Sequence, residues 1–194
     1  MNWLFFSLFL FTLLVIYNVY QNSEMMQLTC IKSEVDGNKY CVRERNRIEE
    51  SADMLARVTQ KLKKLVNYVA DKFPNRENVK RMKENFRPQK IMETLPTSEL
   101  TAYTENKGEK MAFCVTRKKN GTKLIDENTL TFVAIHELAH VMTKAHHHKD
   151  EFWHNFKFLL VQAKQIGVYI PEDYKKAPKT YCGMEITDNP YYDL

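Results

Sequence analysis

His136-Glu137-Leu138-Ala139-His140 is the stretch of this sequence that decides the interpretation of its fold. Residues i and i+4 of a helix share one face, so His136 and His140 would direct both imidazoles at one metal ion. Glu137 lies one position further round, where its carboxylate would reach a water molecule rather than the metal. Zinc takes nitrogen ligands and hydrolysis needs a base for the water, so the pattern is typical of a zinc hydrolase. By composition alone, H-E-x-x-H would occur in roughly one such chain in a hundred, so its flanks have to be considered.

The residues around this pattern have the spacing of a buried helix. Asp126, Asn128 and Thr129 are residue types that cap helices, and they predict a helix that begins near Asn128. Such a helix would lie in the core and present only its His/Glu face to a cleft. The alternative, two ordinary helical histidines beside a surface glutamate, is less favoured because the motif requires a helical context and finds one. The apolar positions are Leu130, Val133, Ala134, Leu138, Val141 and Met142.

A catalytic zinc site needs a third protein ligand, and two downstream histidines compete for that role. His146 follows His140 by six residues, the interval of the metzincins, but Thr143 stands where those proteins have a turning glycine. Without that glycine the helix could continue and carry His146 away from the metal. His148 precedes Phe152 by four residues, so it can open the next helix with Phe152 buried beneath it. We therefore expect zinc to be bound by the two motif histidines and His148, with His146 as the alternative third ligand.

Other side chains nearby are weaker candidates for the metal. Asp150 would offer an oxygen ligand, and Glu172 is a more distant candidate of the same kind. His147 and His154 are expected to support the ligands or to lie on the surface.

Three segments together resemble the WLM metallopeptidase domain, a family related to the SprT/Spartan-like proteases. They are residues 106–117, which begin Asn-Lys-Gly, the pentapeptide itself, and residues 148–153, which read His-Lys-Asp-Glu-Phe-Trp. The resemblance covers roughly residues 45 to 185, and the pentapeptide is its most specific part. The family usually reaches its third histidine sooner, through a tight Gly-Pro or similar turn, whereas this chain has extra residues and no glycine there.

The resemblance implies an α+β, zincin-like metallopeptidase domain over residues 45–194, with a small antiparallel sheet and the HExxH helix. It also implies Zn²⁺ as the cofactor, with His136, His140 and His148 as ligands and Glu137 as the catalytic base. Members of the family that act on DNA-crosslinked proteins carry separate nucleic-acid or ubiquitin/SUMO-binding tails, and this chain offers no room for them.

The N-terminus predicts a membrane helix. Residues 3–20 carry no charge, and about 18 residues at 1.5 Å each span roughly 27 Å, close to the hydrocarbon thickness of a bilayer. Trp3, Tyr17 and Tyr20 lie near its ends, where interfacial aromatic residues belong. A cleaved signal peptide would have a basic start and small residues before Gln21, and neither is evident. We expect residues 1–22 to be an uncleaved anchor, residues 23–44 a juxtamembrane segment, and the bilayer a partner of the chain.

The side of the membrane stays open on sequence grounds. Lys32 and Lys39 place the nearby basic charge after the helix, which favours a cytosolic domain. The cysteines favour the opposite side, because Cys30 and Cys41 could close a small loop and Cys114 with Cys182 completes an even count. Residues 120–122 also form a glycosylation sequon in a basic turn.

Periodicity assigns the rest of the domain. A long amphipathic helix is predicted over 44–73 and a short basic helix over 78–86. Strands are predicted over 90–95, 100–104 and 110–117. A further helix is predicted over 152–166, with its end at Gly167. A hairpin-like turn at Asn120-Gly121 leads to residues 123–125, and residues 168–194 are expected to be loop-like. Cys114 is expected to be a buried small residue rather than a nucleophile.

Two surfaces have candidate partners. The strand over 110–117 could hold an extended protein or peptide substrate at a sheet edge, or be purely structural. The net charge is +5, and the densest basic run would suit nucleic acid, but a solvated helix face is favoured because the charges are mixed with Glu84. The members of this run are Lys80, Arg81, Lys83, Arg87 and Lys90.

The sequence thus predicts a membrane-anchored zinc peptidase in which Glu137 takes a proton from water and passes it to the leaving amine. Tyr169, Tyr174 and Tyr181 are candidates, by residue type alone, for a donor to the developing oxyanion. Two rivals are a catalytically idle, membrane-tethered zinc-binding module and a DNA-dependent protease that acts on protein–DNA crosslinks.

Overall fold

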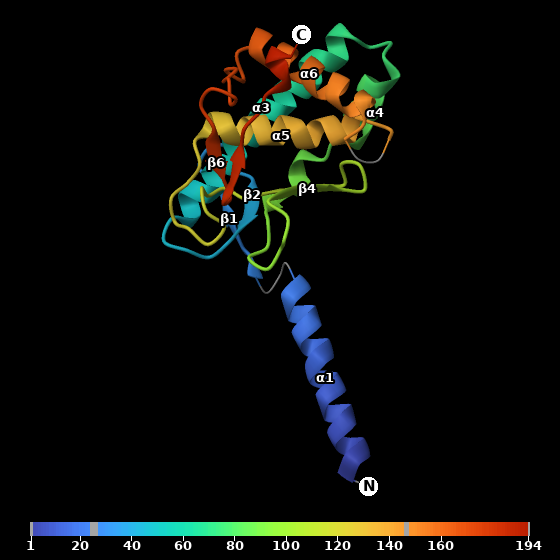
Figure 1. Cartoon of the computed structure of the whole chain (residues 1–194), viewed down its shortest axis with the longest axis vertical. Helices are drawn as coiled ribbons and strands as arrows, with labels where there is room; N and C mark the ends of the chain where they lie inside the picture. The colour runs from blue at the N-terminus through green and yellow to red at the C-terminus, as the bar shows by residue number, and fades with distance from the viewer. Residues whose placement is uncertain (1, 24–26, 146–147, 194) are drawn as a thin grey trace.

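The computed structural model of the chain describes residues 2–23, 27–145 and 148–193. Within them the chain is an α+β protein in which helices and small sheets pack around one main core, and this confirms the predicted class. Figure 1 shows α1 (Asn2–Asn22) standing apart from this packed body as a single straight helix.

Helix α1 is apolar along its length, yet it lies outside the core. Its span Trp3–Gln21 is 19 residues long with a mean hydropathy of 1.9, and none of it is buried inside the structure. The helix is long and apolar enough to cross a membrane, a property that a signal sequence near the N-terminus shares.

A disulfide-bonded hairpin follows α1. Strands β1 (Thr29–Lys32) and β2 (Lys39–Val42) pair antiparallel, and the disulfide Cys30–Cys41 joins directly opposite residues, as the spacing of these cysteines suggested. The hairpin packs on α3 and β3, so the predicted juxtamembrane segment 23–44 contributes strands to the packed body, which begins before residue 45. The physical reason is the apolar side of β2, which is buried in the main core.

Two amphipathic helices form one wall of that core. Helix α3 (Ile48–Lys72) begins four residues later than predicted, and α4 (Glu77–Asn85) lies within one residue of its prediction, with Pro74 between them. Of the apolar residues that recur there at three- and four-residue spacing, Ile48 and Phe73 at the ends are only partly buried. The others are buried: Leu55, Val58, Leu62, Leu65, Val66 and Val69.

The central sheet is mixed rather than antiparallel as predicted. Its strands β3 (Ile91–Glu93), β4 (Ala102–Glu105) and β5 (Lys110–Phe113) lie in the order β3-β5-β4, with β4 antiparallel and β3 parallel to β5. After β3 the chain crosses to the far side before it forms the β4–β5 hairpin, so β5 lies between the other two strands. Met111 and Phe113 therefore face the main core, as predicted, while the intervening residue faces a smaller cluster on the other side.

Helices α5 (Glu127–Met142) and α6 (Asp150–Gln165) pack against each other beside this sheet (Figure 1). The Asp126 side chain accepts a hydrogen bond from Thr129 N at 2.9 Å and caps α5, close to the predicted start. Beyond α6 the chain turns through Gly167 at a φ of 70°, as its predicted place after the helix requires.

The C-terminal region is more regular than predicted. Residues 168–194 were expected to be loop-like, but β6 (Lys179–Tyr181) and β7 (Met184–Ile186) form an antiparallel hairpin, followed by the 3₁₀ helix η2 (Pro190–Tyr192). Strands of three residues are too short to show an alternating pattern in sequence. The turn at Asn120-Gly121 is present, because Thr116 and Leu124 form an antiparallel bridge across it.

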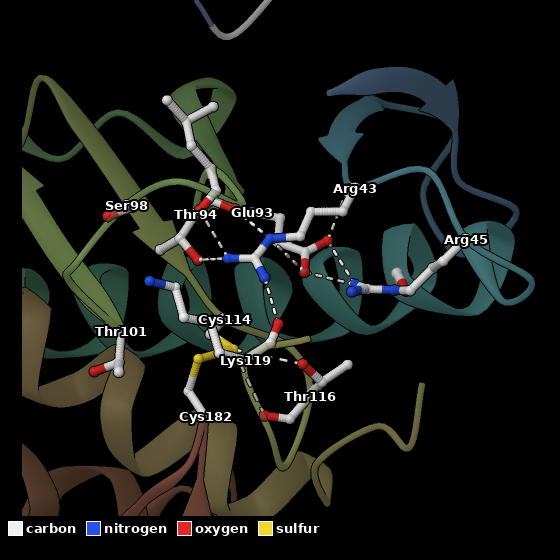
Figure 2. Close-up of polar contacts among 12 residues, drawn as sticks. Arg43, Arg45, Glu93, Thr94, Ser98, Thr101, Cys114, Thr116, Lys119 and Cys182 are labelled. Carbon is white, nitrogen blue, oxygen red and sulfur yellow. Dashed lines mark hydrogen bonds and ion pairs between the residues drawn. A yellow bond between two sulfur atoms is a disulfide. The ribbon is translucent and has the colours of Figure 1, made fainter. Parts of the chain in front are cut away.

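A buried ion cluster joins the hairpin to the central sheet (Figure 2). The Glu93 side chain is fully buried, accepts from Arg45 Nη2 at 2.5 and 2.6 Å, and accepts from the backbone N–H of Arg43 at 2.9 Å. The Arg43 guanidinium donates to the carbonyls of Thr94, Leu95 and Lys119 and to the Thr94 hydroxyl. Each charge has partners, which is the condition for burying it without a large penalty.

The second disulfide, Cys114–Cys182, ties the end of β5 to the β6–β7 hairpin (Figure 2). Cys114 is buried, as expected from sequence, and is paired with Cys182. The two cysteines of this disulfide are 68 residues apart in sequence, far more than the 11 residues that separate Cys30 from Cys41.

We predict that Cys114→Ala with Cys182→Ala lowers the free energy of unfolding by about 4 kcal/mol, because the unfolded chain loses its long closed loop. Cys30→Ala with Cys41→Ala is the matched control, with a smaller expected loss of about 3 kcal/mol. Urea unfolding in detergent, followed by the fluorescence of Trp153, measures both. Equal losses, or no loss from the first pair, would contradict this ranking.

Candidate metal centre

Three imidazoles converge at the cleft side of α5. His136 and His140 lie one turn apart on this helix, and His148 lies two residues before α6. One ligand nitrogen from each residue lies within 4.8 Å of the other two, and the Nε2 atoms of His140 and His148 are 3.0 Å apart. The structure thus brings the three predicted ligands together from two elements that are separate in sequence.

Phe152 supports the three rings from below, in the position that its spacing from His148 predicted. Its side chain is fully buried, and its ring centroid lies 4.8, 4.4 and 4.5 Å from those of His136, His140 and His148. Because each imidazole packs on the same buried ring, their relative orientation is set by the packing of α6 on α5.

Burial sets the protonation of the two motif histidines. Together with the neighbouring imidazoles, it lowers the pKa of His136 to about 3 and that of His140 to about 4. Both rings are therefore neutral near pH 7, which is the form that binds a metal ion.

Glu137 is buried at the same cleft and is held by the edge strand. Its carboxylate Oε2 accepts a hydrogen bond from Thr104 Oγ1 at 2.8 Å. Burial raises the pKa of Glu137 to about 7, and the bond from Thr104 opposes this shift. A divalent cation beside it would lower this pKa, because a positive charge favours the ionised carboxylate.

The Asn106-Lys107-Gly108 turn between β4 and β5 supports the cleft from another side. All three residues have positive φ, of 44°, 59° and 120°. At Gly108 a Cβ would lie 2.7 Å from Asn85 O and 2.8 Å from a methyl carbon of Val141, so only glycine fits against α4 and α5.

This turn also fixes the chain that leads to the third histidine. Helix α5 ends at Met142 although no glycine follows it, which differs from the expectation that the helix could continue through Thr143. Lys107 Nζ donates to Thr143 O at 3.2 Å and Ala145 O at 2.8 Å, so side-chain donors satisfy carbonyls beyond the helix end. The Glu151 carboxylate accepts from the backbone N–H groups of Lys144 and Ala145, at 3.0 and 3.2 Å.

Lys107→Met is expected to weaken zinc binding by roughly 10-fold to 100-fold while the fold is retained, because the chain that positions His148 loses its two bonds to Lys107. Competition for zinc with a chelating dye measures the affinity. Lys110→Met, on the next strand, is the control, because Lys110 forms an ion pair with Glu105 at 2.7 Å instead. The same affinity in both variants would contradict a positioning role for Lys107.

The free edge of the sheet lies at β4, not at the predicted strand. The strand over 110–117 was considered as a substrate-binding edge, but β5 is paired on both sides and cannot accept another strand. Strand β4 is terminal in the sheet, and Tyr103, Thr104 and Lys107 line one hollow together with the three imidazoles.

A mostly apolar cavity of about 330 Å³ opens on the other side of His136 and Glu137. The C-terminal hairpin forms one of its walls and is held there by the disulfide to Cys114. Its lining includes Phe132, Val133, Phe156, Tyr181, Met184 and Ile186.

The weaker ligand candidates lie outside this cluster. Asp150 begins α6 as an exposed residue, and Glu172 accepts from Asn128 and forms an ion pair with Lys179 at 3.0 Å. His154 is exposed, with Nδ1 2.7 Å from the Asp150 carbonyl oxygen. His146 and His147 lie outside the described residues.

The three tyrosines proposed as oxyanion donors are buried, and the hydroxyls of two of them take part in hydrogen bonds within the core. Tyr181 lines the apolar cavity, but its hydroxyl donates to Thr101 O at 3.0 Å. The Tyr169 hydroxyl accepts from Asn189 at 2.8 Å, and Tyr174 packs edge-on against Phe132.

Most of the basic run is occupied by contacts within the chain. Lys80 pairs with Glu77 at 2.7 Å, and Lys83 donates to Asn67 at 2.7 Å. Arg81 donates to the Met142 carbonyl at the end of α5. These contacts favour the interpretation of a solvated helix face over a nucleic-acid surface.

Comparison with known proteins gives relatives but no activity. No family model and no solved structure matches the chain. It is 29% identical over 169 residues to an uncharacterized protein of Acanthamoeba polyphaga mimivirus, with 82% of each chain covered. It is 38% identical over 82 residues to an uncharacterized protein of Invertebrate iridescent virus 6, covering 42% of this chain and 44% of the relative. A similar match, 39% over 83 residues, covers 50% of an uncharacterized protein of Invertebrate iridescent virus 3.

Proposed function

We propose that this protein is a membrane-anchored, zinc-dependent metallopeptidase with a zincin-like domain of the WLM type. The observation that carries the proposal is the set of three imidazole nitrogens within 4.8 Å of one another, in a cleft that also contains the buried carboxylate of Glu137. The resemblance of its sequence motifs to the WLM family supports the same assignment.

The donor set suits zinc. Two nitrogens that are each about 2.1 Å from one tetrahedral ion lie about 3.4 Å apart, and the observed separations bracket this value. His136, His140 and His148 would hold the ion and leave one position open, as catalytic zinc sites do. When bound, zinc supplies a Lewis acid that polarises a carbonyl group and lowers the pKa of water toward neutrality.

Glu137 would transfer the proton, and β4 would bind the substrate. The Glu137 oxygen that does not accept from Thr104 would take the proton of the attacking water and later pass it to the leaving amine. A protein or peptide substrate in extended form would add to the edge of β4, whose backbone provides affinity with little sequence selection. The retention of a buried glutamate beside the imidazoles disfavours a binding module without catalysis, because such a module needs no base.

The two disulfides favour the oxidising side of the membrane for the domain in this proposal. All cysteines of the described residues are paired, and disulfides persist in oxidising compartments. They outweigh the weak positive-charge argument from Lys32 and Lys39, and they disfavour a nucleic-acid-dependent protease. A glycan on Asn120 after translation into microsomes, lost in Asn120→Gln, is the expected result; an unmodified domain would contradict this side.

Activity is tested on the full chain purified in detergent. We expect about one zinc ion per chain, cleavage of casein, loss of cleavage with 1,10-phenanthroline and its recovery with added zinc. Protein that binds zinc but leaves casein and unfolded peptides intact would instead be the catalytically idle module. Protein without zinc would exclude the metal centre.

A further inference from the structure

The end of α1 is bonded to the folded domain rather than joined by a loose tether. Thr97 Oγ1 donates to Gln21 O at 2.6 Å, and Gln27 Nε2 donates to Tyr20 O and Gln21 O, both at 2.7 Å. The last carbonyls of a helix have no partner within it, so these side chains complete the helix end.

The loop that carries Thr97 is itself fixed to the core. Arg43 donates to the carbonyls of Thr94 (Figure 2) and Leu95, and Thr94 N donates to Phe113 O on β5. Hydrogen bonds at both ends of the short segment 94–97 therefore connect the end of α1 to the central sheet.

The same loop leads directly into the edge strand of the proposed peptidase site. Gln21 and Thr97 line a hollow together with Leu100, Tyr103 and Thr104. These last three residues also line the hollow that contains the imidazoles. The two hollows therefore adjoin at these three residues, and together they are called the β4 groove here.

The backbone of β4 can accept a strand along this groove. Cys114 N donates to Thr101 O, so Thr101 belongs to a hydrogen-bonded pair, and alternation directs the N–H and C=O groups of Ala102 and Thr104 away from β5. The four steps from Leu100 to Thr104 span about 13 Å at 3.3 Å per residue. The Leu100 side chain, 58% exposed, lines both hollows.

We infer that the substrates are extended juxtamembrane segments of other membrane-anchored proteins, cleaved roughly five to ten residues from their own bilayer helix, because the end of α1 is fixed beside β4. The inference rests on the proposed peptidase activity and on α1 as a retained anchor. A segment that leaves the bilayer beside α1 meets β4 before it reaches Glu137, because the hollow beside α1 adjoins the hollow of the imidazoles at this strand.

The experiment uses the full chain in phosphatidylcholine liposomes with casein-derived reporters fused to a transmembrane helix through Gly-Ser spacers. We expect at least tenfold faster cleavage with a spacer of about eight residues than with one of about forty. Ten Gly/Ser residues inserted after Ser23 should move the optimum to longer spacers, and Thr97→Val should broaden it. The insertion should not alter cleavage of soluble casein, which has no bilayer helix of its own.

Equal rates at all spacer lengths, with soluble casein still cleaved, would overturn this inference and leave the peptidase proposal intact. A mature chain that begins after residue 22 would overturn it as well. If neither soluble casein nor any reporter is cut by zinc-loaded protein, the peptidase proposal itself fails, so the two failures are distinguishable.

Discussion

Glu137→Gln is expected to leave zinc binding unchanged and to lower peptide hydrolysis by about 10²-fold to 10⁴-fold. The amide has the size of the carboxylate, and its oxygen still accepts the bond from Thr104 that now measures 2.8 Å. It cannot take a proton from water, so only the base function is lost. Zinc content by atomic absorption and turnover of a fluorogenic peptide, measured on the same preparation, separate the two effects.

Glu127→Gln is the matched control for this substitution. Glu127 lies in the first turn of the same helix, where it forms ion pairs with Arg57 at 2.8 Å and Lys61 at 2.6 Å, away from the cleft. Loss of surface ion pairs of this kind has small effects on stability. We expect full activity in this variant. A Glu137→Gln variant as active as this control would exclude Glu137 as the base and would reopen the mechanism.

The helices and the candidate ligands could be predicted because their signals are local. The period of 3.6 residues located α3 and α5 within a few residues, and Gly167 marked the end of α6. The i, i+4 spacing of His136 and His140 and the four-residue step from His148 to Phe152 are local as well. Helix geometry alone therefore predicted that Phe152 would lie beneath His148, whereas its contact with His140 was not predicted.

The sheet and the supporting side chains could not be predicted, because they depend on contacts distant in sequence. Nothing near residues 91–93 indicates that β3 pairs in parallel with β5, because β4 lies between these two strands in the sequence. Thr104 contacts Glu137, which is 33 residues further along the chain. Lys107 contacts carbonyls of the chain before His148, which are 36 and 38 residues further along. The Asn-Lys-Gly sequence was a usable signal for the turn, since a chain with consecutive positive φ values favours asparagine and glycine. That tripeptide does not indicate which carbonyl groups Lys107 contacts.

His148→Ala is expected to lower zinc affinity by at least about 100-fold and to abolish hydrolysis, because removal of one of three ligands leaves an incomplete site. The competing assignment of His146 makes this the most informative substitution in the downstream segment. The Nε2 atom of His148 lies 3.0 Å from that of His140 and its ring packs 4.5 Å from Phe152, so both contacts favour His148. Zinc titration and peptide turnover give the two readouts.

His146→Ala and His147→Ala are the comparison variants, and both are expected to bind zinc with nearly unchanged affinity. The same ranking should appear in thermal stability with zinc present, because a ligand that binds only the folded state raises its stability according to affinity. If His146→Ala loses zinc while His148→Ala retains it, the third ligand follows the metzincin interval, and Lys107 would then position His146. Losses of only a few-fold in both single variants, with complete loss in the double variant, would mean that either imidazole can complete the site. The chain between α5 and α6 would then hold its histidines less strictly than the bonds from Lys107 and Glu151 imply.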